Sequence, residues 1–124
     1  MKLTDFGLTS KLTTPNPENG NSYVCGTFEY TSPEMLERNE DGKALDWWTL
    51  GCCLYELLYQ VSPFYSDDKN FMKENILQKD PVFSGKTSST LRNLIKNLLV
   101  KDPSKRLEFV QNIKNHRLFE GINF

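Results

Sequence analysis

The amino-acid sequence predicts a mainly α-helical fold. Residues 91–99 carry the apolar stripe of an amphipathic helix, with apolar side chains at helical spacing: Leu91, Leu94, Ile95, Leu98 and Leu99. Residues 47–58 are apolar on every face, a pattern typical of a helix at the centre of a protein. The length of 124 residues is enough for one domain with a hydrophobic core and is too short for two.

Helix-start signals predict the first two helices. Residues 11–22 are rich in Thr, Pro, Asn and Gly, which predicts an exposed loop. Ser32-Pro33-Glu34 then predicts a helix start, because Ser caps free amides, Pro fits the first turn and Glu favours the positive end of the dipole. This helix runs through residues 35 and 36. Asp46 is predicted to cap the long apolar helix, which reaches about Gln60.

Three further helices are predicted after Pro63-Phe64. Ser66-Asp67-Asp68 opens the first, and Ser88 or Ser89 caps the second, which carries the apolar stripe. The last is predicted from Glu108 to Asn115, with Leu118 and Phe119 packing behind it. The sequence therefore predicts a helical domain throughout.

Composition excludes several classes of protein. The formal charge of −1 comes from acids and bases spread along the chain, without the basic cluster that nucleic acid or an anionic membrane requires. The apolar stretch 50–58 is too short to span a bilayer, and no secretion signal opens the chain. We therefore expect a cytoplasmic location, with the nucleus as the alternative. Cys25, Cys52 and Cys53 are odd in number, which predicts reduced thiols, with the adjacent pair on different sides of a helix.

The order of the motifs resembles the second half of a protein kinase. These motifs are Asp5-Phe6-Gly7, Cys25-Gly26-Thr27-Phe28-Glu29-Tyr30, Ser32-Pro33-Glu34, Asp46-Trp47-Trp48 and Asp102 to Leu107. Together with the closing residues 116–124 they are similar to the AGC group of serine/threonine kinases, over essentially the whole chain. The resemblance implies the C-terminal lobe of an α+β kinase fold, without the N-lobe β-sheet and the catalytic loop. Residues 1–34 would be the activation segment and residues 35–124 the helical lobe.

The resemblance also implies two cofactors, ATP and Mg²⁺. Asp5 would be the Mg²⁺ ligand, Phe6 would pack to set the active position, and Gly7 would allow the backbone to turn. Thr27 would support a catalytic base that this chain does not contain. Tight binding of either cofactor would need upstream sequence.

A protein substrate with basic residues is the implied partner. By resemblance, Val24, Phe28 and Thr31 would form the pocket for the residue after the phosphoacceptor. Glu29 and Glu56 would recognise basic residues before it. An acid such as Glu56 in an apolar helix is costly unless it is paired or faces a groove.

Other residues have implied structural roles. Glu34 and Arg106 resemble the buried ion pair of the family, with Trp48 covering it. Asp46 resembles the helix-cap acid that holds the catalytic loop. His116 is interpreted as a packing or capping residue near a helix end, and not as a general base.

The chain also departs from the family pattern. Tyr23 stands where a phosphorylated threonine is expected, so an upstream activating kinase would act on Ser22 or Tyr23, or the switch is lost. Phe28 replaces the usual Pro, which would reshape the substrate pocket. The Gly-rich loop, the strand Lys, the catalytic base and the second metal ligand do not occur in the 124 residues, which predicts an inactive isolated chain. Two functions stay open: part of a kinase, or a non-catalytic fragment that binds substrates or regulators.

Overall fold

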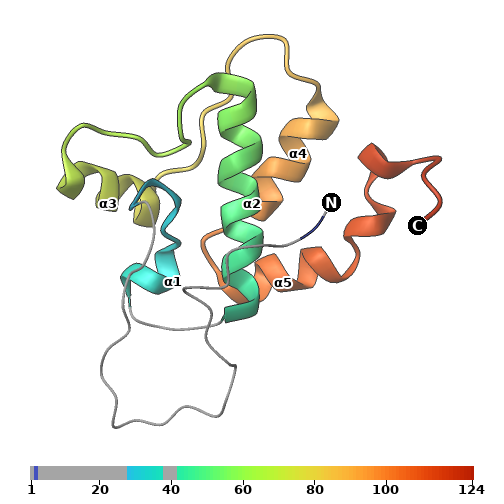
Figure 1. The fold of residues 1–124 in the computed structure, drawn as a ribbon, viewed down its shortest axis with the longest axis horizontal. Helices are drawn as coiled ribbons and strands as arrows, with labels where there is room; N and C mark the ends of the chain where they lie inside the picture. Colours follow the sequence, from blue (N-terminus) through green and yellow to red (C-terminus); the bar gives the residue numbers. More distant parts are fainter. Residues whose placement is uncertain (1, 3–27, 38–41) are drawn as a thin grey trace, which may run out of the picture.

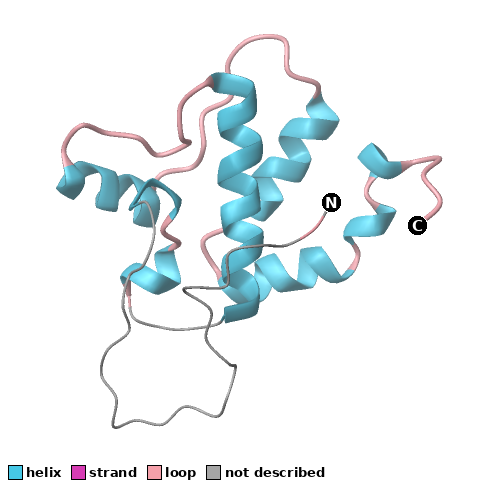
Figure 2. Cartoon of the chain, viewed as in Figure 1, coloured by secondary structure: helices cyan, strands magenta, loops and turns pink. Residues whose placement is uncertain are grey.

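The computed structural model describes residues 2, 28–37 and 42–124, and in these residues it is helical without a strand (Figure 2). The α-helices are α1 (Pro33–Leu36), α2 (Gly42–Tyr59), α3 (Lys69–Gln78), α4 (Ser89–Leu98) and α5 (Pro103–Gln111). Three 3₁₀ turns accompany them: η1 (Phe28–Tyr30), η2 (Ile113–Asn115) and η3 (Arg117–Phe119). The predicted mainly α fold is confirmed. Of the described helices, none has the length and apolar character that a membrane span requires.

Helix α2 forms the centre of the fold (Figure 1). Helix α4 packs along it and α5 crosses one of its ends, while α1 and α3 lie together on the other side. The core combines side chains of α2 with residues from α3, α4 and the connecting loops: Trp48, Cys52, Tyr55, Phe64, Met72, Ile76, Ile95 and Leu99. The opposite face of α2 is open among the described residues, and Leu57 there is 74% exposed.

Helices α2 and α4 approach closely at Gly51. A Cβ atom added to this glycine would lie 2.9 Å from Leu99 Cδ2 and 3.0 Å from Leu98 Cβ. Real Cβ atoms do not come this near to other heavy atoms, so the contact requires a residue without a side chain. Gly51 therefore sets the distance between the two helices.

Two predicted helix caps and one predicted helix start are confirmed. The Ser32 hydroxyl accepts a hydrogen bond from the Met35 amide at 3.4 Å and begins α1. The Asp68 carboxylate accepts from two amides at the start of α3, at 2.7 and 3.2 Å. The Ser88 hydroxyl accepts from the Leu91 amide at 3.2 Å and begins α4. Of the two candidates for that last cap, Ser88 is the residue used.

The prediction that Asp46 caps the long helix is wrong. Helix α2 begins at Gly42, so Asp46 lies in its second turn with an exposed side chain. The helix begins four residues before Asp46 because Ala44, a strong helix former, is fully buried in this first turn. Lys43 is part of the same turn. The carbonyl of Leu45 in this first part accepts a hydrogen bond from the Thr49 hydroxyl at 3.2 Å.

The prediction for the last helix is also wrong in its bounds. Helix α5 begins at Pro103, one residue after Asp102, whose carboxylate accepts hydrogen bonds from the amides of Ser104 and Lys105. An acid followed by Pro is a helix start of the same type as Ser32-Pro33. Residues 113–119 continue as the 3₁₀ turns η2 and η3. Of the two residues predicted to pack behind the helix, Leu118 is 38% exposed, whereas Phe119 is half-buried with its ring against that of His116.

Candidate substrate-binding site

The structure describes only part of the predicted site. Asp5, Phe6, Gly7, Ser22, Tyr23, Val24 and Thr27 lie outside the described residues. The predicted residues that it describes are Phe28, Glu29, Thr31, Glu34, Asp46, Trp48, Glu56 and Arg106. Of these, Asp46 is exposed on the first part of α2 and takes no part in the contacts given below.

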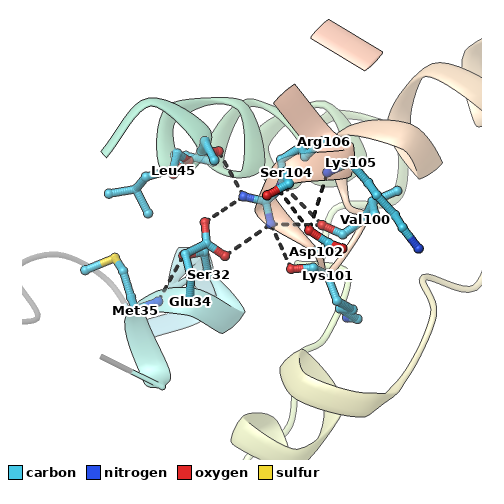
Figure 3. A network of polar contacts seen from close by, with 12 residues as sticks. Ser32, Glu34, Met35, Leu45, Val100, Lys101, Asp102, Ser104, Lys105 and Arg106 are labelled. Carbon is cyan, nitrogen blue, oxygen red and sulfur yellow. Dashed lines mark hydrogen bonds and ion pairs between the residues drawn. The ribbon is translucent and has the colours of Figure 1, made fainter. Parts of the chain in front are cut away.

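The buried ion pair between Glu34 and Arg106 is present as predicted (Figure 3). Arg106 Nη1 lies 2.6 Å from Glu34 Oε1, and Arg106 Nη2 lies 3.1 Å from Glu34 Oε2. The exposed fractions of the two side chains are 0% and 3%. The Trp48 ring covers the pair, with its centroid 5.0 Å from Arg106 Cζ. A bidentate contact of this kind joins α1 firmly to α5.

The guanidinium of Arg106 also donates to backbone carbonyls. Nη1 donates to the Ala44 carbonyl at 2.9 Å, and Nε and Nη2 donate to the Val100 carbonyl at 3.1 and 2.8 Å. Nη2 further contacts the Lys101 carbonyl at 3.3 Å. Arg106 therefore ties α1, the start of α2 and the turn before α5 to one point. Backbone acceptors leave no signal in residue identity, so these carbonyl contacts could not be predicted from the sequence.

Glu56 is paired with Tyr30. The Tyr30 hydroxyl donates a hydrogen bond to Oε2 of Glu56, which is half-buried on α2. This bond to a carboxylate raises the pKa of Tyr30 to about 12, with smaller contributions from burial and from the charge of Glu56. An acid in an apolar helix is costly unless it is paired or faces a groove, and for Glu56 this hydrogen bond provides the partner. Tyr30 itself was missed, because the two residues are 26 positions apart and nothing local links them.

Residues 28–31 form a turn against the core. The Thr31 amide donates to the Phe28 carbonyl at 3.1 Å, and the Phe28 side chain packs against the core cluster. The Thr31 side chain is 5% exposed. Between them, Glu29 is half-buried, and its negative charge contributes to the raised pKa of Tyr65, which comes first from a hydrogen bond to Asp67. Negative charge therefore gathers around η1.

The other predicted residues with possible chemistry have structural surroundings. Cys52 is buried and Cys53 is exposed, which confirms that the adjacent pair faces different sides of α2. Nδ1 of His116 accepts from the Leu118 amide at 3.2 Å, and its Nε2 lies 3.1 Å from Asn93 Oδ1, so its predicted capping role is confirmed. Within residues 28–37 and 42–124 no group of three or more His, Cys, Asp and Glu is placed to hold a metal ion.

Comparison with known proteins gives a consistent set of similarities. Residues 1–119 match the protein kinase domain family. The chain is 43% identical over 125 residues to the serine/threonine-protein kinase Sgk1 of Danio rerio, and 42% identical over 126 residues to Sgk2 of Homo sapiens. It is 41% identical over 123 residues to a RAC family serine/threonine-protein kinase homolog of Dictyostelium discoideum. Each alignment covers 98% of the chain but only 28%, 34% and 27% of the respective relative.

Proposed function

This chain belongs to the protein kinase domain family, and from that premise we propose that it is part of an ATP-dependent serine/threonine protein kinase. Such an enzyme transfers the γ-phosphate of ATP to a Ser or Thr hydroxyl of a protein. The observation that carries the proposal is the attachment of residues 28–36 to the helical core. Tyr30 is bonded to Glu56 on α2, and Glu34 is paired with Arg106 on α5. Two attachments on one short segment give a rigid platform, as positioning of a substrate requires.

The proposed substrate is a protein segment with basic residues. Glu56 is half-buried at this platform, and among the described residues its only hydrogen bond comes from Tyr30. Glu29 adds a second carboxylate on η1. Carboxylates accept strong, charge-assisted hydrogen bonds from Arg and Lys side chains. Phe28 and Thr31, together with Val24, are proposed to form the wall next to the phosphoacceptor.

Asp5, Phe6 and Gly7 are proposed to contribute the chain's share of the ATP and Mg²⁺ site. The Asp5 carboxylate is a hard oxygen donor, the ligand type that Mg²⁺ prefers, so this donor fits the ion. When bound with ATP, Mg²⁺ neutralises charge on the phosphates during transfer. Phe6 would pack to set the active position and Gly7 would allow the backbone to turn, while Thr27 would support a base contributed by another segment.

A chimera tests the proposed activity. The chain replaces the aligned residues of the Danio rerio Sgk1 kinase, and phosphate transfer is measured on two Ser peptides that differ only in Arg or Ala before the serine. We expect transfer to both peptides and a preference for the Arg peptide. A Glu56→Gln substitution should lower kcat/KM for the Arg peptide by about 10- to 100-fold, because a hydrogen bond to a charged group is lost. Glu74→Gln, an exposed acid on α3, is the matched control.

Two further measurements examine the rest of the proposal. Calorimetry on the isolated chain should detect no tight Mg²⁺-ATP binding, because one carboxylate alone provides little of the site. Tight binding would contradict the proposed division of the active site. Phosphopeptide mapping of the protein from cells should find phosphate on Ser22 or Tyr23, which would support an upstream activating kinase as partner.

The alternative function is a non-catalytic fragment that binds kinase substrates or regulators. Exposed apolar side chains on α3 and in the loop after it favour this function, since Phe71 is 62% exposed and Val82 is 75% exposed. An inactive chimera that retains the helical circular dichroism of the parent kinase would support it. An active chimera would argue against it.

A further inference from the structure

Lys101 has an unusual position in the turn between α4 and α5. Its side chain is only half-buried, yet its terminal Nζ atom is buried and has no hydrogen-bond partner among the described residues. Nζ lies 3.7 Å from the centroid of the Phe64 ring and 5.0 Å from that of Trp48. These rings are stacked on each other, with centroids 5.4 Å apart and planes inclined by 11°. A lysine side chain normally buries its methylene groups and directs its ammonium to water.

The environment of this amine disfavours its charged form. An ammonium carries three N–H donors, and burying them without acceptors costs free energy that contact with ring faces only partly offsets. Burial accordingly lowers the pKa of Lys101 to about 8, from 10.5. Three groups face it from the elements around it. Asp80 from the α3–α4 loop and Cys52 from α2 oppose this decrease, and Arg106 from α5 adds to it.

We propose that Lys101 forms a proton-sensitive contact that holds the segment leading into α3 against α2. The neutral amine stays against Phe64 and Trp48, whereas the protonated amine favours an open arrangement in which it extends towards Asp80 and water. The proposal concerns a conformational equilibrium of the helical core and does not depend on kinase activity.

Phe64 connects this equilibrium to α3. The Phe64 carbonyl accepts a hydrogen bond from Asn75 Nδ2 of α3 at 3.3 Å, and the Phe64 ring is 3% exposed in the core. When the amine leaves the rings, the Phe64 ring loses a packing partner and Phe64 becomes less firmly held. The hydrogen bond from Asn75 to the Phe64 carbonyl is then weakened, so α3 loses part of its attachment. Protonation of Lys101 should therefore loosen α3.

Hydrogen exchange of the 124-residue chain tests the proposal. Amides of residues 69–78 are followed at pH 6.5 and at pH 9.0, and intrinsic exchange rates are divided out. With a pKa of about 8 in the closed state and 10.5 in the open state, the opening equilibrium should be about tenfold larger at pH 6.5. Equal opening at both values in the unsubstituted chain would overturn the proposal.

Two substitutions each fix residue 101 in one charge state. Lys101→Met is always neutral and should keep α3 closed at both pH values, whereas Lys101→Arg is always charged and should leave it open at both. Lys105→Met removes an exposed lysine four residues away and should keep the tenfold difference. Loss of the pH dependence in Lys105→Met, or its retention in Lys101→Met, would contradict the proposal.

A spectroscopic titration covers the case in which Lys101→Met does not fold. In the unsubstituted chain, the Cε and Hε signals of Lys101 should titrate near pH 8 and show ring-current shifts from Phe64 and Trp48. Titration above pH 10 without ring-current shifts would mean that the amine never occupies this position, and the proposal would then be wrong.

Discussion

Glu34 and Arg106 are 72 residues apart in the sequence and meet in a buried bidentate ion pair. Arg106 is fully buried, and the Trp48 ring lies over its guanidinium. The pair joins the segment 28–36 to the far end of the helical core. The importance of the pair for the free energy of unfolding is best measured by removing one partner, because a charge left alone in a buried site is costly.

A Glu34→Gln substitution should therefore destabilise the chain strongly. The guanidinium would keep its backbone carbonyl acceptors but lose its counter-charge, at a cost of about 3 to 5 kcal/mol in the free energy of unfolding. Urea denaturation followed by circular dichroism measures this cost. Glu37→Gln, an exposed acid three residues away, should change stability by no more than about 0.5 kcal/mol. Equal effects of the two substitutions would contradict the interpretation.

A Tyr30→Phe substitution should cost about 1 kcal/mol, because it removes the hydrogen bond to Glu56. The bond also makes stability depend on pH. The pKa of Tyr30 is about 12 in the folded chain and 10 in the unfolded chain, so the folded state holds this proton more tightly. The stabilisation is complete below pH 10 and is lost as the pH rises to 12. Carbon NMR of labelled tyrosines measures the titration, and Glu56→Gln should shift it towards pH 10.

A Gly51→Ala substitution should destabilise the α2–α4 contact by about 1 to 3 kcal/mol, because the new methyl group has no space. Leu99 can move only at the expense of core packing, and Leu98 Cβ is fixed by its own helix. Cys53→Ala, at an exposed position of the same helix, serves as the control. Adding Leu99→Ala to Gly51→Ala should cost less than the sum of the single effects, since the larger cavity accommodates the methyl group. Strict additivity would argue against the close contact.

Cys53 should react with iodoacetamide much faster than Cys52. Burial is the main cause that raises the pKa of the Cys52 thiol to about 12, three pH units above its ordinary value of 9. At pH 8 the fraction of Cys52 present as the reactive thiolate is therefore about 1,000-fold smaller than for a thiol of ordinary pKa. The burial of Cys52 also blocks access of the reagent. Mass spectrometry of timed samples measures both rates. In urea the two rates should become equal, and similar rates in the folded chain would show that Cys52 is accessible.

The sequence was most informative where structure is local. Ser32 and Ser88 cap helices as predicted, and Asp68 caps α3 within the predicted helix start 66–68, because each cap involves only the next three residues. The start of α2 could not be predicted in this way, since the burial of Ala44 extends the helix past the polar Asp46. The start of α5 is encoded locally in Asp102-Pro103, an acid followed by a proline, and the predicted start at Glu108 does not take this signal into account.

The candidate site was less accessible to sequence reasoning. The Glu34–Arg106 pair came from resemblance to a family, and no local pattern connects residues so far apart. The Tyr30–Glu56 bond and the position of Lys101 depend on how α2 meets its neighbours. A lysine after an apolar stripe reads as a surface residue, because periodicity describes helix faces and not the path of one long side chain.

The two hydrogen bonds of His116 specify where its ring proton lies. Nδ1 must be bare to accept from the Leu118 amide, so the hydrogen is on Nε2 and is donated to Asn93 Oδ1. The same amide oxygen accepts from Asn97 Nδ2, which settles which way the Asn93 side chain is turned. This one tautomer therefore links α4 to the final turns of the chain through two hydrogen bonds. Alkylation of either imidazole nitrogen would break one of these two hydrogen bonds and weaken the link between α4 and the final turns.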